Sequence, residues 1–162
     1  STVVRISDNL AKQARLRSKL EQRSMTSQLE YWAKIGKTAE DNPDLPFSFI
    51  KETLLARAEI QYSDKEEYTF AKQKVFLSPT FSRKLKKLTK QEKVSLDEAV
   101  RFLIENPESG QQKKGDLLGV RVYKFKINKQ LTLLSYELVS DSIHLLTFGS
   151  HENFYRDIKR DR

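Results

Sequence analysis

The chain has 162 residues, of which 38% are hydrophobic and 32% are charged, and its formal net charge is +8. This length fits one domain or two small ones, and the composition allows a small hydrophobic core. The absence of cysteine excludes disulfides, thiolate metal sites and a cysteine nucleophile, and it favours a reducing, cytoplasmic location. Because the longest apolar runs are only a few residues, the sequence predicts neither a membrane span nor a secretory signal.

The positive charge is concentrated in the second half of the chain. Residues 1–60 have a net charge of +2, residues 61–70 of −2, and residues 71–162 of +8. Such an excess of lysine and arginine attracts polyanions, although lysines also keep small domains soluble. The charge therefore predicts a nucleic-acid partner for the second half, with solubility as the alternative explanation.

The first sixty residues read as a short strand followed by helices. Residues 2–6, TVVRI, alternate like a β-strand, and Ser7 or Asp8 offers a helix N-cap directly after them. Ser24 and Thr26 open a second helix, and the third begins at Pro46 after a proline-rich break. The third helix is expected to bury the apolar residues at helical spacing, Phe47, Ile50, Leu54 and Ala58.

A single strand ahead of helices needs a partner for its backbone groups, and a second copy of the chain is the simplest one. The two copies of residues 2–6 would then form an antiparallel ribbon that fits a DNA major groove. Alternation turns Val3 and Arg5 outward to the base edges, and the helix start around Ser24 and Thr26 offers N–H groups to a phosphate. We therefore expect a homodimer that binds operator DNA.

Residues 2–36 resemble the ribbon-helix-helix repressors in the TVVRI strand, in the spacing of Leu10, Ala14 and Ser18, and in the Arg23-Ser24 start of the second helix. Residues 1–60 as a block look like the ParD-like antitoxins of bacterial toxin–antitoxin systems. This likeness implies a DNA-binding antitoxin that represses its own operator and whose C-terminal segment covers a toxin.

Residues 61–73 have no clear period and are predicted to be a linker or a neutralising segment that orders against something else. The rest of the chain, 74–162, is predicted to be a second domain with its own order of elements. Its predicted elements are a strand over 74–81, two helices over 82–105, strands over 117–127, 131–138 and 142–149, and a helix over 152–160. Short connections favour an antiparallel sheet with helices on it, so the expected fold class is α+β.

Two features of the second domain suggest chemistry. Lys124 and Lys126 share one face of a strand, and like charges held so close favour an anion between them. His151 follows the last strand, with Tyr155 and Arg156 after it, so it is a candidate acid or base.

Residues 74–160 resemble the RelE/ParE toxin superfamily in VFLSPTFSRKLKKL, in LGVRVY, in LTLLSYEL and in FGSHENFYRDIKR. The likeness to the RelE branch implies ribosome-dependent mRNA cleavage with the RNA 2′-OH as nucleophile and with no metal or cofactor. It implies His151 as acid or base and Lys124 and Lys126 as charge stabilisers. Arg121, Tyr155 and Arg156 are expected to position the substrate. One departure is Leu133, which stands where the RelE branch carries a further arginine.

The sequence thus combines an antitoxin-like and a toxin-like module, and the leading hypothesis is a chain that neutralises its own mRNA-cleaving toxin half. A second hypothesis is a ParE-like toxin half that inhibits DNA gyrase and cleaves nothing. A third is a transcriptional regulator whose toxin half is catalytically inactive.

Overall fold

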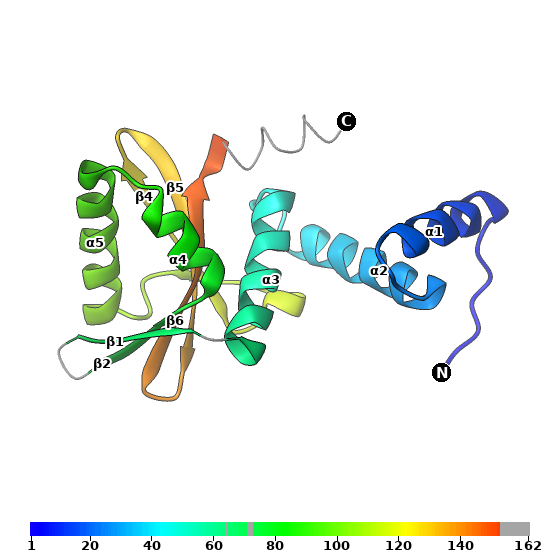
Figure 1. The fold of residues 1–162 in the computed structure, drawn as a ribbon, viewed down its shortest axis with the longest axis horizontal. Coiled ribbons are helices and arrows are strands. Elements are labelled where there is room, and N and C mark those ends of the chain that lie inside the picture. The colour runs from blue at the N-terminus through cyan, green and yellow to red at the C-terminus, as the bar shows by residue number, and fades with distance from the viewer. Residues whose placement is uncertain (64, 71–72, 153–162) are drawn as a thin grey trace.

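The computed structural model describes residues 1–63, 65–70 and 73–152, and it forms an elongated molecule with a two-helix body at one end and a sheet at the other (Figure 1). The first three helices are α1 (Asp8–Leu20), α2 (Met25–Asp41) and α3 (Phe47–Tyr62). Ser7 caps α1 and Ser24 caps α2, each with a side-chain oxygen that accepts a backbone N–H, which confirms the predicted helix starts.

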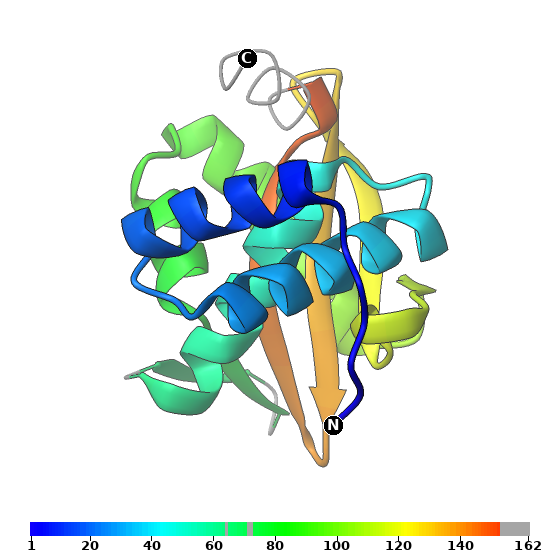
Figure 2. The same cartoon turned by 90° about the vertical axis from the view of Figure 1, so that its right-hand side faces the viewer.

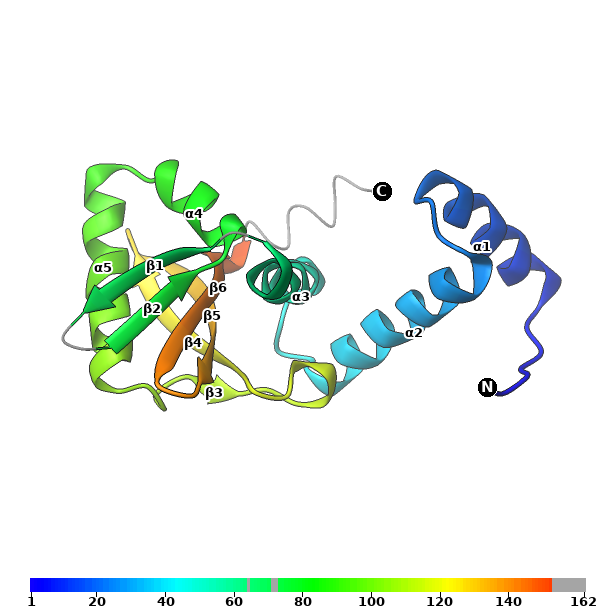
Figure 3. The same ribbon diagram turned by 60° about the horizontal axis from the view of Figure 1, so that its bottom comes forward.

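Residues 1–7 have no secondary structure in the single chain, where the predicted strand has no partner to pair with. Their apolar side chains are open to solvent, since Val3 is 96% and Val4 74% exposed. Ala14 and Ser18 of α1 are buried between α1 and α2, which agrees with the repressor-like spacing of these small residues. From this body α2 runs as one straight helix to the sheet domain (Figure 3).

The sheet has six strands in the order β1-β2-β6-β5-β4-β3. Its strands are β1 (Glu66–Phe70), β2 (Gln73–Leu77), β3 (Gln111–Gln112), β4 (Val120–Ile127), β5 (Gln130–Val139) and β6 (Ser142–Ser150). The helices of this domain are α4 (Pro79–Lys86) and α5 (Lys90–Glu105), and a 3-10 turn covers Gly115–Leu117.

The α+β class is confirmed, but the sheet is mixed rather than wholly antiparallel because β2 pairs with β6 in parallel. After β2 the chain passes through α4 and α5 before it returns to the sheet at β3 and β4. Such a long crossover lets the first toxin strand lie parallel to the last one.

The segment predicted as a linker is ordered over much of its length. α3 continues to Tyr62, and β1 then forms an edge strand antiparallel to β2, with Tyr68 opposite Val75. The antitoxin-like part of the chain therefore supplies one strand of the toxin-like sheet. The predicted helix over 152–160 lies outside the described residues apart from its start.

Helices cover both faces of the sheet, α5 on one side and α3 on the other (Figures 1 and 2). The core under α5 is built from strands of the sheet and from α4 and α5, with Tyr136 fully buried in it. The Tyr136 hydroxyl donates to Pro107 O and accepts from Gly110 N, so the loop after α5 is anchored to the sheet. The second core lies under α3 and joins the two halves of the chain.

Candidate functional site

Strand β4 divides its side chains between the two faces of the sheet as its alternation predicts. Val120 and Val122 are buried under α3, and Lys124 and Lys126 continue the same face toward solvent. On the other face Tyr123 stacks on Phe125, with ring centroids 5.8 Å apart, and both pack against the core under α5. The two candidate lysines therefore lie on the face of the sheet that α3 covers.

Strand pairing brings these lysines to the same end of the sheet as His151. Lys124 pairs with Leu133, which pairs with Gly149, so Lys124 and Gly149 lie two strands apart, on the order of 10 Å. Lys126, two residues further along β4, pairs with Leu131. His151 follows directly after Ser150 at the end of β6. The arrangement places the three candidate groups around one open end of the α3 face.

Leu133 lies in the middle of this face and is fully buried. It belongs to the same cluster as Val122, Leu146 and Ile50 of α3. A charged arginine could not occupy this position with α3 in place, because an unpaired buried charge costs several kcal/mol, about 3–5 by mutational measure. The departure from the RelE pattern at Leu133 is therefore part of the contact between the two halves.

Arg121 does not join the lysines. It alternates to the opposite face of β4 and donates from Nη1 to the carbonyl oxygens of Glu108, at 3.2 Å, and Gly110, at 3.0 Å. Its guanidinium therefore holds the loop between α5 and β3 on the face opposite Lys124, and its role in positioning substrate stays a prediction. Tyr155 and Arg156 lie outside the described residues.

Helix α3 covers the apolar part of the lysine-bearing face, next to the exposed Lys124 and Lys126. The shared cluster contains residues from both halves of the chain: Leu45, Phe49, Ile50, Ala56 and Ile60 before the junction, and Leu117, Val120, Val122, Leu133 and Leu146 after it. Each of these side chains is at most 5% exposed. Removal of apolar area on this scale from water is the main force that holds the antitoxin-like helix on the toxin-like sheet.

Polar contacts fix the position of α3 on the sheet. Arg57 Nε lies 2.7 Å from Glu137 Oε1, and the same guanidinium donates to Asp116 O at 3.0 Å and Leu118 O at 2.8 Å. Near the middle of the helix Thr53 Oγ1 donates to Ser135 Oγ at 3.0 Å, and both side chains are fully buried. These bonds satisfy polar groups that α3 would otherwise bury without a partner.

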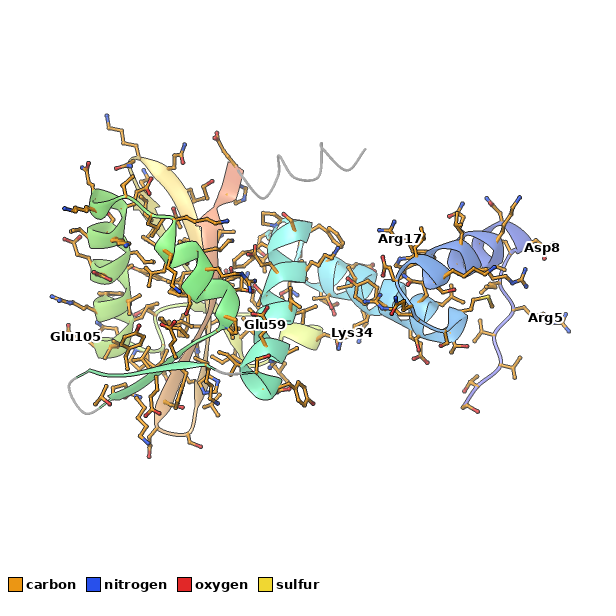
Figure 4. All side chains as sticks on the ribbon, in the orientation of Figure 1. Arg5, Asp8, Arg17, Lys34, Glu59 and Glu105 are labelled. Carbon is orange, nitrogen blue, oxygen red and sulfur yellow. The ribbon has the colours of Figure 1, made fainter. Side chains whose placement is uncertain are left out.

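Further polar contacts join α3 to α4. Glu59 accepts from the backbone N–H of Thr80 at 3.0 Å and from its hydroxyl at 2.7 Å, and it is labelled in Figure 4. Lys84 Nζ lies 2.7 Å from Glu52 Oε1 and donates to Phe148 O on β6. The helix is therefore held by the sheet and by its flanking helix together.

The loop between α2 and α3 places a carboxylate over the edge of the site. Asp44 Oδ2 lies 2.6 Å from Lys113 Nζ and 3.8 Å from Lys124 Nζ. Next to it Asn42 Nδ2 donates to Lys114 O at 3.2 Å, and Asn42 Oδ1 accepts from Lys114 N at 3.1 Å. Sequence reasoning treated these residues only as a break between helices and placed the covering segment after them.

Burial of the Asp44 carboxyl works to raise its pKa, but the hydrogen bond and charge of Lys113, with the charge of Lys124, outweigh it. The pKa of Asp44 therefore lies below its usual 3.8. Since the folded state holds this proton less tightly than the unfolded state, the carboxylate stabilises the fold above about pH 4 and loses this effect as the pH falls.

We expect Asp44→Asn to lower the free energy of unfolding by about 1–3 kcal/mol at pH 7, because Lys113, whose side chain is only 3% exposed, loses its charged partner. Below the folded-state pKa of Asp44 the variant and the parent should converge. Urea denaturation at neutral and acidic pH measures this, with the exposed Glu98→Gln as control. A difference that stays the same at both pH values would contradict the assignment.

The candidate DNA-binding residues lie at the opposite end of the molecule. Figure 4 shows Arg5 beyond α1, far along the long axis from Glu105 of α5. Ser24 is engaged as the cap of α2, accepting from Ser27 N at 3.1 Å, and Thr26 lies in the first turn of that helix. The structure therefore keeps the residues predicted for DNA apart from those predicted for RNA.

In the described ranges no group of three or more histidine, aspartate or glutamate side chains could hold a metal ion. No helix in that part of the chain is both long and apolar enough to cross a bilayer.

Comparisons with known proteins match two families to successive parts of the chain. The ParD-like antitoxin family of type II bacterial toxin-antitoxin systems matches residues 1–72. No curated protein matches. Among solved structures, the intact E. coli RelBE toxin-antitoxin complex is 15% identical over 47% of this chain and 93% of its own, with a TM-score of 0.40. The isolated E. coli RelE toxin is 16% identical over 54% of this chain and 97% of its own, also with a TM-score of 0.40.

The remaining part of the chain, residues 75–159, matches the family described as the ParE-like toxin of type II bacterial toxin-antitoxin systems. This match covers more than half of the residues and includes all the strands of the sheet except β1 and the start of β2. The chain therefore belongs to the ParE-like toxins of type II toxin–antitoxin systems and carries a ParD-like antitoxin in the same polypeptide.

Proposed function

We propose that this fusion represses its own operator through residues 1–41 and silences its toxin half with residues 42–62 of the same chain. The observation that carries the proposal is the packing of α3 on the sheet face that also bears the lysines, with Asp44 against Lys113 and Lys124. A covalently linked inhibitor acts at an effective concentration of about millimolar, so a free partner is not needed for silencing. The proposed boundaries are 1–60 for the antitoxin domain, 61–73 for a linker that extends the neutralising contact, and 74–162 for the toxin domain. We also propose that the protein is cytoplasmic.

The DNA-binding part of the proposal needs a homodimer. The exposed, unpaired segment 1–7 supports it, because its backbone groups and its apolar side chains gain partners when two copies form a ribbon. Val3 and Arg5 would then face the base edges, and the N-terminal turn of α2 at Ser24 and Thr26 would face a phosphate.

We expect Arg5→Ala to weaken operator binding by about 1–3 kcal/mol, roughly 5- to 150-fold, because a lost arginine–base contact has this cost. Electrophoretic mobility shifts with the DNA upstream of the reading frame measure it at fixed salt. Lys51→Ala, on exposed α3 surface, serves as control. Unchanged specific binding by the Arg5 variant would show that the ribbon does not read the operator.

For the toxin half we propose metal-independent cleavage of mRNA on the ribosome. In this reaction the RNA 2′-OH gives its proton to a base and its oxygen attacks the neighbouring phosphorus. The P–O5′ bond breaks to leave a 2′,3′-cyclic phosphate, and the leaving 5′-oxygen takes up a proton from an acid. His151 is proposed to move a proton, and Lys124 and Lys126 to offset the charge on the phosphate. The shared end of the sheet at which these three groups lie supports this assignment, with Tyr155 and Arg156 proposed as positioning groups.

A second function is favoured by Leu133. The centre of the covered face is apolar rather than cationic, which suits a surface that binds a protein better than one that stabilises a phosphorane. We therefore keep inhibition of DNA gyrase as the second candidate for the toxin half.

The test is a released toxin half in a cell-free bacterial translation reaction, with mRNA ends mapped by primer extension. Ile50→Asp places a charge in the apolar contact that holds α3 on the sheet, and we expect cuts in translated message that the parent chain does not make. Adding His151→Ala should abolish them. Intact message together with loss of gyrase supercoiling would instead support the second candidate.

A further inference from the structure

The connection between α4 and α5 carries an unusual concentration of positive charge. Residues 83–93 hold six basic residues and one acidic residue, a net +5 within a chain of net +8. Arg83 and Lys84 turn toward Glu59 and Glu52 of α3. The other four form a group that we call the basic corner: Lys86, Lys87, Lys90 and Lys93.

The basic corner has no counter-charge within the described part of the chain. No carboxylate there lies within 4.0 Å of its ammonium groups. The one acid of the segment, Glu92, turns back to accept from Thr89 N at 2.9 Å in a capping box. The side chains of Lys86, Lys87 and Lys90 are exposed to solvent, and that of Lys93 is half-buried.

Stability of the helices does not explain these lysines. Lys86 at the end of α4 is favourable for the helix dipole, but Lys90 is the first residue of α5 and Lys93 lies in its first turns. Positive charge at a helix N-terminus opposes the helix dipole and is destabilising. The corner thus bears an electrostatic cost that a bound polyanion would remove.

The backbone beneath the corner is held in place. Leu85 and Leu88 pack against the core under α5, on either side of the exposed Lys86 and Lys87. The capping box fixes the start of α5 immediately afterwards. A pre-formed, rigid array of cations loses little conformational entropy when it binds a regular array of phosphates.

The position of the corner favours RNA. It lies at the end of the sheet where the β4–β5 turn carries the exposed Lys126 and Lys129, as the views in Figures 1 and 2 agree, and at the opposite end of the long axis from residues 1–7. DNA held by the ribbon is therefore remote from it. Unlike the apolar part of the lysine-bearing face, the corner is not covered by α3.

We propose that the basic corner binds the phosphodiester backbone of structured RNA in the intact, silenced chain. Binding through the corner and silencing through α3 are then independent, so the fusion associates with RNA without cutting it. Lysine side chains on a helical turn act as point charges, so the binding reads backbone shape and charge rather than base sequence. The proposal stands whether or not the toxin half cleaves RNA.

The test uses the full chain and a labelled RNA duplex of about 16 base pairs, with fluorescence anisotropy measured between about 50 and 200 mM salt. Lys86→Glu/Lys87→Glu/Lys90→Glu should weaken binding at least tenfold and make the slope of log K against log salt shallower by about 2–3. Lys34→Glu/Lys37→Glu/Lys51→Glu, with the same charge change on exposed parts of α2 and α3, should bind like the parent.

An equal loss in both triple variants would overturn the proposal, because it would reflect net charge alone. Unchanged RNA binding by the corner variant would also overturn it. If that variant keeps RNA binding and loses binding to phosphatidylserine vesicles, the corner binds an anionic membrane surface instead. A DNA duplex of the same sequence should bind the corner variant as it binds the parent, and a loss for DNA as large as the loss for RNA would overturn the preference for RNA. Circular dichroism melting of each variant checks that the fold is kept.

Discussion

Replacing Ile50 with aspartate is expected to free α3 from the sheet and to cost the fold more than about 4 kcal/mol. Ile50 is fully buried in the cluster that both halves of the chain share. An aspartate there would bury an unpaired carboxylate against Leu133 and Val122, so the helix either leaves the sheet or the sheet domain unfolds.

Hydrogen–deuterium exchange followed by mass spectrometry separates these outcomes. Peptides from α3 should exchange faster in the variant. Peptides from α1 should keep the parent's protection, because in the described chain the extensive packing of α1 is with α2. Leu55→Asp, the same chemical change at a position that is 55% exposed on the same helix, should leave both unchanged. If Ile50→Asp and Leu55→Asp behave alike, α3 does not dock as described.

The second large effect is expected at Arg57, whose guanidinium joins α3 to Glu137 and to two carbonyl groups of the loop before β4. Arg57→Ala should lower the free energy of unfolding by about 2–4 kcal/mol, because Glu137, whose side chain is 13% exposed, loses its charged partner.

A double-mutant cycle with Glu137→Gln, measured by urea denaturation, should give a coupling energy of about 1 kcal/mol or more between the two side chains. The matched control is Arg17→Ala, which removes an ion pair with Glu21 of the same 2.7 Å length on the exposed surface of α1. That change should cost no more than about 0.5 kcal/mol. Equal costs at Arg57 and Arg17 would mean that the anchor contributes nothing.

The sequence predicted the helix starts and the strand alternation well because both depend on local chemistry. Ser7 and Ser24 cap helices through their own side chains, and the alternation along β4 separates Lys124 from Tyr123 by backbone geometry alone. These features need no knowledge of what the chain packs against.

The buried face of α3 was not predictable in the same way. The sequence predicted that Phe47 is buried, but its side chain is 42% exposed. The buried residues of α3 are Phe49, Ile50, Thr53, Ala56 and Ile60. Apolar residues lie almost all round this helix, so helical spacing alone does not choose a face. The sheet makes the choice, through partners such as Ser135 that lie far along the chain.

Long-range pairing explains the other departures. The sequence of 61–73 was compatible with a linker or with a segment that orders against something else, but it does not show that β1 will pair with β2 at the sheet edge. Arg121 likewise has the residue type of a substrate contact, and only the strand register places it on the face opposite Lys124. Type and spacing identified the candidate residues, and tertiary packing decided which of them come together.

The central claim is that the antitoxin-like segment silences the toxin half of its own chain, and zero-length carbodiimide cross-linking tests it directly. Asp44 and Lys113 lie 2.6 Å apart within one chain. A mixture of nitrogen-14 and nitrogen-15 protein, unfolded together and refolded, should give an Asp44–Lys113 cross-linked peptide pair with unmixed isotopes only. Cross-linked pairs that combine the two isotopes would show that the segment covers the partner's sheet, and absence of any cross-link at this position would show that it does not dock there.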